Sequence, residues 1–166
     1  KQVSTLDVLS GGRAMLGLGA GWNEPEAVSL GVPFPPIAVR FEQLEEQLQI
    51  AHRMFSGSEE PFVGKHYRLE RPLNHPAPLR RPPIMVGGSG EKFLLRVVAR
   101  HADWWNYVWK GSEAYTHKQE VLKGHCREVG ARLGQRAGPA DDAAHRVDRG
   151  DARARGADPG APSADH

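Results

Sequence analysis

The sequence of 166 residues contains a single cysteine, few aromatic residues and no long apolar run. Because Cys126 has no second cysteine to pair with, an internal disulfide is excluded, and we expect a reducing compartment such as the cytoplasm. No segment approaches the roughly 20 apolar residues that a membrane span requires. The formal net charge is only +2 and no basic run is interleaved with aromatics, so neither nucleic acid nor a membrane surface is an expected partner.

Apolar side chains almost disappear after residue 133. Residues 134–166 contain no Leu, Ile, Phe, Met, Trp or Tyr, and most of them are Ala, Asp, Arg, Gly or Pro. Such a composition cannot bury enough apolar surface to offset the entropy cost of ordering, so we expect this segment to be disordered. The sequence therefore predicts one ordered domain over residues 1–133, followed by a low-complexity tail over residues 134–166.

Within residues 1–133, helical patterns alternate with short apolar runs. The apolar runs lack polar alternation, which is typical of strands covered on both faces, and they lie at residues 14–20, 83–86 and 104–108. Helices are expected at residues 1–9, 41–55, 91–101 and 112–129, with a small hairpin at 62–69. This alternation predicts an α/β fold with parallel βα units. Three units cannot close an eight-stranded barrel, which takes roughly 250 residues, so the chain is either a small open sheet or the middle of a barrel.

The turn after the second expected strand is the strongest candidate for a binding site. It reads Gly87-Gly88-Ser89-Gly90 and directly precedes the helix expected from Glu91. Glycines at such a point let a phosphate approach the backbone, and the amides that open the helix can bind it. Ser89 could add a hydroxyl group. The alternative is a tight turn that binds nothing.

Glycines also punctuate the first expected strand, at Gly17, Gly19 and Gly21. The dinucleotide-binding fingerprint is not met, because its third glycine position is Trp22 and no helix is expected between this strand and about Arg40. We interpret the glycines as clearing room beside a flat ligand. Trp22 is then either an aromatic wall of that site or a packing residue.

Other chemistry has no support in the pattern. The eight histidines show no metal-ligand spacing, and no Ser/His/Asp set or carboxylate pair can be placed on neighbouring strand ends. We therefore expect no metal site and no hydrolase. Trp104 and Trp105 point to opposite faces of their strand, so one is expected in the core and the other could reach the strand ends.

Several segments, in order along the chain, match one family: residues 5–13 (TLDVLSGGR), 16–22 (LGLGAGW), 40–46 (RFEQLEE), 64–67 (GKHY), 82–88 (PPIMVGG) and 100–106 (RHADWWN). Together they resemble the luciferase-like monooxygenase superfamily, nearest to its oxidoreductases that use the deazaflavin coenzyme F420. The resemblance implies a (β/α)8 TIM barrel with an inserted hairpin. Of this barrel the chain would contain strands four to six, a partial barrel.

The resemblance also implies a site and a chemistry. The end of strand four would contact the cofactor ring, and the turn after strand five would hold its phosphate through backbone amides; these residues are Ala20, Gly21, Trp22 and Asn23, and Gly87, Gly88, Ser89, Gly90 and Glu91. The cofactor would be F420, which exchanges a hydride with a small organic substrate, or alternatively FMN in a monooxygenase. Sugar phosphates are disfavoured, because Trp22 stands where that branch of the family has a glutamate.

Strands one to three, seven and eight of the family pattern are missing, and the chain begins with Lys1 rather than Met. We therefore expect a fragment, and the catalytic acid or base cannot be assigned because its usual segment is absent. The tail is hypothesised to be out-of-frame translation or a gene-calling artefact. Uncovered strand edges would favour aggregation or a homodimer, and a non-catalytic truncated product stays open as an alternative.

Overall fold

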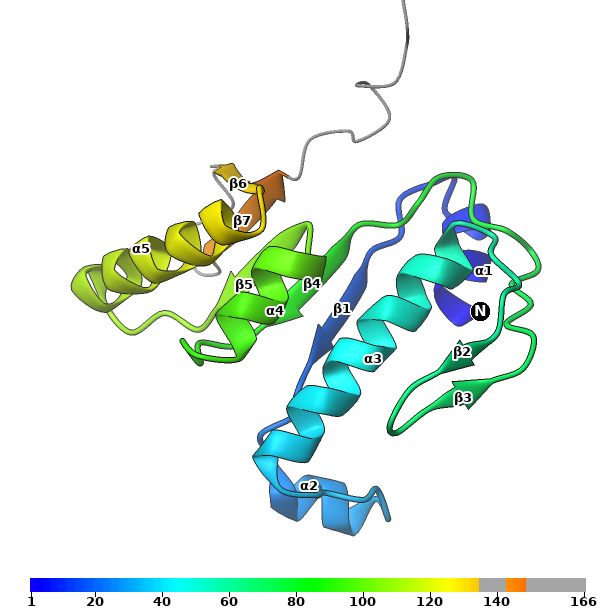
Figure 1. Ribbon diagram of the computed structural model, residues 1–166, viewed down its shortest axis with the longest axis horizontal. Helices are drawn as coiled ribbons and strands as arrows, with labels where there is room; N and C mark the ends of the chain where they lie inside the picture. The colour runs from blue at the N-terminus through cyan, green and yellow to red at the C-terminus, as the bar shows by residue number, and fades with distance from the viewer. Residues whose placement is uncertain (135–142, 149–166) are drawn as a thin grey trace, which may run out of the picture.

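Three parallel strands lie side by side along one half of the main sheet, in agreement with the predicted βα units (Figure 1). The structure, a computed structural model, describes residues 1–134 and 143–148. The parallel strands are β1 (Leu16–Gly19), β4 (Ile84–Gly87) and β5 (Trp104–Tyr107). The register pairs Gly19 with Gly87 and Gly87 with Asn106, so the carboxyl ends of all three strands lie at one edge of the sheet.

Four of the helices are the predicted ones: α1 (Gln2–Leu9), α3 (Ile37–Phe55), α4 (Leu94–His101) and α5 (Ser112–Glu128). A further helix, α2 (Glu24–Ser29), follows β1 in a segment where no helix was expected. The Asn23 side chain accepts a hydrogen bond from the Glu26 amide, and a proline stands in the first turn, as in many helix starts. The expectation of no helix between the first strand and Arg40 is therefore wrong.

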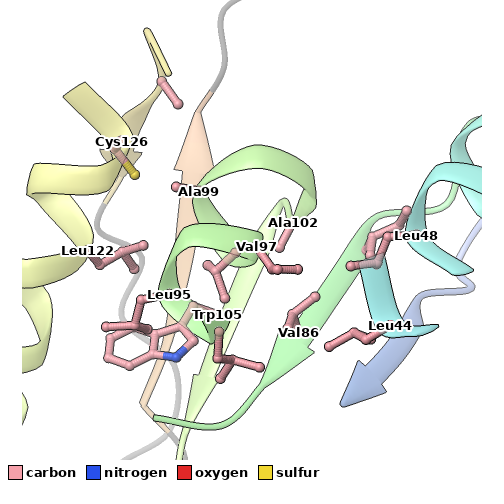
Figure 2. Packing of buried hydrophobic residues seen from close by; sticks show 14 of the residues in the cluster. Leu44, Leu48, Val86, Leu95, Val97, Ala99, Ala102, Trp105, Leu122 and Cys126 are labelled. Carbon is pink, nitrogen blue, oxygen red and sulfur yellow. The ribbon is translucent and has the colours of Figure 1, made fainter. Parts of the chain in front are cut away.

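Helices α3, α4 and α5 cover one face of the sheet and form the core with it (Figure 2). The strands contribute the side chains that alternate toward this face, Ile84, Val86 and Trp105, all fully buried. The helices contribute Leu44, Leu48, Leu95, Val98, Leu122 and Cys126 to the same cluster. Burying a large apolar side chain contributes roughly 1.5–3 kcal/mol, so this single cluster accounts for most of the cohesion between the sheet and the helices.

The opposite face of the sheet is different. Alternation places Gly17, Gly19, Met85 and Gly87 there, and the first two are exposed. No helix among the described residues contributes to a core on this side. The strands thus carry packing side chains on the face toward the helices. On the opposite face they carry almost no side chains near the strand ends.

Two more strands continue the sheet beyond β5, in an antiparallel sense. They are β6 (Arg132–Gly134) and β7 (Ala143–Asp148), and β7 pairs with β5 from Trp104↔Arg146 to Tyr107↔Ala143. Strand β7 falls in the segment for which disorder was expected, and it satisfies the edge of β5, which would otherwise be unpaired. Residues 135–142 and 149–166 lie outside the described residues, so disorder of the tail stays a prediction there.

The hairpin of β2 (Phe62–Val63) and β3 (Arg68–Leu69) is attached to α3 by several side chains of that helix, among them the Glu46 carboxylate. Glu46 accepts hydrogen bonds from the backbone amides of Lys65 (2.7 Å), His66 (3.0 Å) and Tyr67 (2.9 Å). Any side chain at Gly64 would collide with this carboxylate. Partial burial raises the pKa of Glu46, but the three amides outweigh it and hold the pKa below its ordinary value of 4.5.

We predict that Glu46→Gln lowers the free energy of unfolding by about 1 kcal/mol at pH 7, because the ionised acceptor for three amides is lost. The stabilisation by a carboxylate of lowered pKa is present in full above pH 4.5 and is lost as the pH falls through the lowered pKa. The difference in free energy of unfolding between the unsubstituted chain and Glu46→Gln, measured by urea denaturation, should therefore shrink in acid. Glu42→Gln, which removes the charge that faces Lys65 and His66 but touches none of the three amides, is the control and should have a smaller effect. Equal losses in the two variants, or a difference independent of pH, would contradict the role given to Glu46.

Candidate functional site

A cavity of about 560 Å³ lies at the carboxyl ends of the three parallel strands. This volume is in the range of small-molecule sites, and the carboxyl edge is where ligands bind in βα folds. We call it the strand-end cavity; its lining consists of Gly17, Leu18, Gly19, Ala20, Gly21, Trp22, Ile37, Phe41, Met85, Gly87, Gly88, Ser89, Gly90, Leu94, Asn106 and Val108. Trp22 stands on its rim with 87% of its surface exposed.

The turn after β4 borders this cavity and contains backbone donors that have no protein acceptor. The Gly88 amide donates to the carbonyl of Asn106 at 3.1 Å, which extends the pairing of β4 and β5 by one step. Within the part of the chain that the structure describes, the amides of Ser89, Gly90 and Glu91 have no protein acceptor. Adjacent backbone amides without a protein acceptor can bind an anion.

Helix α4 begins at Leu94, three residues later than expected, and a turn closed by the Leu95 amide on the Gly90 carbonyl precedes it (3.0 Å). The candidate amides therefore belong to this turn rather than to the first turn of the helix. The sequence could not show this, because residues 91–93 are compatible with either conformation.

Two features determine the shape of the turn. Gly88 has φ +130°, and a Cβ there would lie 2.5 Å from Leu94 Cδ2. Trp105 is buried in the core and donates from its indole Nε1 to the Gly88 carbonyl at 2.8 Å. The prediction that one of the two adjacent tryptophans is a core residue is confirmed for Trp105, whose contact with the turn the sequence did not indicate.

Of the nine residues proposed from the sequence, seven line the strand-end cavity: Ala20, Gly21, Trp22, Gly87, Gly88, Ser89 and Gly90. The side chains of Asn23 and Glu91 are engaged elsewhere. Asn23 caps α2, and the Glu91 carboxylate contacts Lys118 at 2.5 Å and His117 at 3.0 Å on α5. Hydrogen bonds from Lys118 and His117 lower the pKa of Glu91 below its ordinary range. Glu91 does not line the cavity, and its carbonyl is engaged by His125, so of its polar groups only the amide lacks a partner among the described residues.

Sequence reasoning missed several lining residues. Phe41 and Ile37 come from the start of α3, and their ordinary helical spacing indicated packing only. Asn106 is the penultimate residue of β5 and was recognisable as a polar residue near a strand end. A second, smaller cavity of about 360 Å³, the α2–α3 cavity, shares residues 19–22 with the first and is lined further by Asn23, Phe34, Arg40, Gln43 and Gln47 among others.

The described residues, 1–134 and 143–148, contain neither a cluster of metal ligands nor a helix suited to a membrane. No group of three or more His, Cys, Asp or Glu side chains is placed to bind a metal ion there. In the same residues no helix has both the length and the apolar composition that crossing a membrane demands.

We predict that Gly88→Ala lowers the free energy of unfolding by about 1–3 kcal/mol, because the new Cβ meets Leu94 and the positive φ is strained. Gly90→Ala is the matched control, since its Cβ would have neighbours at ordinary contact distances of 3.6 and 3.9 Å. Gly90→Ala should change the free energy of unfolding by less than about 1 kcal/mol. Chemical denaturation of both variants measures the two changes. Similar values for the two variants would show that the turn does not have the described shape.

Known proteins resemble the chain over most of its length. It is 33% identical over 100 residues to an F420-dependent glucose-6-phosphate dehydrogenase of Nakamurella multipartita, covering 60% of this chain and 29% of that protein. It is 30% identical over 121 residues to an FMNH(2)-dependent dimethylsulfone monooxygenase of Pseudomonas fluorescens, covering 73% of this chain and 32% of that protein. The chain thus spans about a third of the length of the curated relatives it matches.

A solved structure shares the fold. The F420-dependent secondary alcohol dehydrogenase in complex with an F420-acetone adduct superposes with a TM-score of 0.67 at 20% identity, over 77% of this chain and 39% of that one. The predicted fold class, an α/β segment of a TIM barrel, is thereby confirmed. Residues 1–146 match the family described as luciferase-like monooxygenase. The chain belongs to the luciferase-like monooxygenase family.

Proposed function

We propose that this chain forms the cofactor-binding part of an oxidoreductase that uses F420, with FMN as the alternative cofactor. The observation that carries the proposal is the set of amides at Ser89, Gly90 and Glu91, which have no acceptor among the described residues and follow a strand end beside a cavity. Relatives named for each cofactor, at 33% and 30% identity, support both alternatives.

The residues present fit a flat ring carrying a phosphate. The wall made by β1 and β4 lacks side chains at Gly17, Gly19 and Gly87, and a Cβ at Gly19 would lie 3.4 Å from the Gly87 carbonyl oxygen. A planar group can approach a backbone surface of this kind without displacing side chains. Apolar side chains of Phe41 and Leu94 close the cavity on the helix side.

Each part of the site would have a separate task. The amides of Ser89, Gly90 and Glu91, with the Ser89 hydroxyl, would hold the phosphate. Ala20, Gly21 and Trp22 would lie beside the ring and exclude water from it, while Asn23 would act by ending the turn at α2. When bound, F420 supplies hydride exchange with a small organic substrate, and FMN supplies oxygen activation in a monooxygenase. The chain contributes orientation of the ring and a dry surface.

Substrate choice is proposed only as a class, a small organic molecule. The secondary alcohol dehydrogenase and the sulfone monooxygenase named above act on small organic compounds by their names, which is compatible with that class. The glucose-6-phosphate dehydrogenase relative is named for a sugar phosphate. By family resemblance, Trp22 stands where the sugar-phosphate branch has a glutamate. We therefore predict that this chain does not act on a sugar phosphate substrate.

We predict that Gly90→Asp weakens binding of F420 and FMN by about tenfold or more relative to Gly90→Asn, because the added carboxylate repels a phosphate at the neighbouring amides. The two side chains have nearly the same shape, and a Cβ at residue 90 meets only ordinary contacts. Fluorescence titration with each cofactor gives the dissociation constants, and competition by inorganic phosphate tests the anion site separately.

Equal affinities for the two variants would place the phosphate elsewhere. Absence of binding of either cofactor to the unsubstituted, folded chain would contradict the proposed function itself and would favour the non-catalytic alternative.

A further inference from the structure

Arg40 makes a set of contacts that packing of α3 does not require. It lies in the first turn of the helix, and its guanidinium reaches back to the end of β1. Nη1 donates to the carbonyls of Gly21 (2.6 Å) and Ala20 (3.1 Å), and Nε donates to that of Pro35 (2.9 Å). The guanidinium carbon also lies 3.8 Å from the centre of the Phe34 ring.

These contacts converge on the segment that both cavities share. Ala20, Gly21 and Trp22 line the strand-end cavity and the α2–α3 cavity, so their backbone is the partition between the two. Gly21 has φ +74°, and a Cβ there would lie 3.6 Å from Phe34 and 3.8 Å from Arg40 Nη1. The chain leaves β1 here and turns into α2, and Arg40 ties that turn to α3.

Arginine is suited to this task in a way that lysine is not. Its planar fork donates in several fixed directions at once and stacks on an aromatic ring, whereas an ammonium group is a single flexible point charge. Arg40 is half-buried, so water competes less for its donors than at an exposed site. Hydrogen bonds to a charged donor are among the stronger ones in proteins.

We infer that Arg40 is a positioning residue, which orders the β1–α2 turn and thereby sets Trp22 at the rim of the strand-end cavity. It acts through the backbone of Ala20 and Gly21 and is not a catalytic residue. The effect on cofactor binding rests on the proposed function, whereas the ordering of the turn does not. No feature of the sequence other than its place in the family-like RFE segment singles it out.

The same helix supplies a matched control. Arg53, three turns or more further along α3, donates from Nη1 to the Pro61 carbonyl at 3.1 Å and lies 5.2 Å from the centre of the Phe62 ring. It has the same kinds of contact, but it lies far along the chain from both cavities and lines neither. Arg40→Lys would therefore loosen the turn at Ala20 and Gly21, whereas Arg53→Lys would loosen the chain at Pro61.

The experiment compares the two variants with the unsubstituted chain. Amide hydrogen exchange at residues 20–23 should become roughly tenfold faster in Arg40→Lys and stay unchanged in Arg53→Lys, since local opening of the turn becomes easier. Affinity for FMN and F420 should fall about tenfold in Arg40→Lys alone, the loss expected for one charged hydrogen bond. The visible absorption spectrum of FMN at saturation should also shift in that variant, and denaturation midpoints should stay similar in the two.

The outcomes separate the two proposals. Unchanged exchange at residues 20–23 in Arg40→Lys overturns the positioning role, whatever the affinity. Faster exchange with unchanged affinity and spectrum overturns its connection to the cofactor. If the unsubstituted chain binds neither cofactor, the proposed function fails, and the exchange data alone still decide whether Arg40 orders the turn.

Discussion

The parallel pairing of β1, β4 and β5 is the constraint on which the candidate site depends. Hydrogen bonds of the ladder align Gly19, Gly87 and Asn106, so that three separate turns begin at the same level of the sheet. A shift of β1 by one residue would exchange the faces of all its side chains, placing Leu18 where the glycines are. The strand-end cavity exists because the register brings the small residues of β1 and β4 to one surface.

The two faces of the sheet differ in how their side chains pack. Side chains toward the helices are large and buried, whereas those toward the other face are absent or small near the strand ends. Trp105 connects the two sides, because its ring lies in the core and its indole nitrogen holds the Gly88 carbonyl of the turn. This hydrogen bond fixes the turn that contains the unpaired amides to the packed core. Binding sites need support of this kind from rigid elements.

Much of this could be predicted from residue patterns, because strands and helices of the βα units follow local apolar periodicity and the glycine turn follows a strand directly. Seven proposed residues meet at one cavity, since parallel strands end at a common edge. The start of α2 carried a readable signal in Asn23 and the proline after it. No sequence signal indicated the contacts of Arg40 with Gly21 or of Trp105 with Gly88, because each contact joins residues that are distant in sequence. The pairing of β7 with β5 could not be predicted either, because it uses backbone groups, which every residue has.

The most direct test of the account follows individual backbone amides while cofactor is added. In ¹H–¹⁵N correlation spectra of the labelled chain titrated with F420 or FMN, the amides of Ser89, Gly90 and Glu91 should show the largest shifts, together with the indole N–H of Trp22. The Gly88 amide, already bonded to Asn106, should move less. A folded chain whose largest shifts lie away from this turn, or that shows no shifts at saturating cofactor, would contradict the claim that these amides hold the cofactor phosphate.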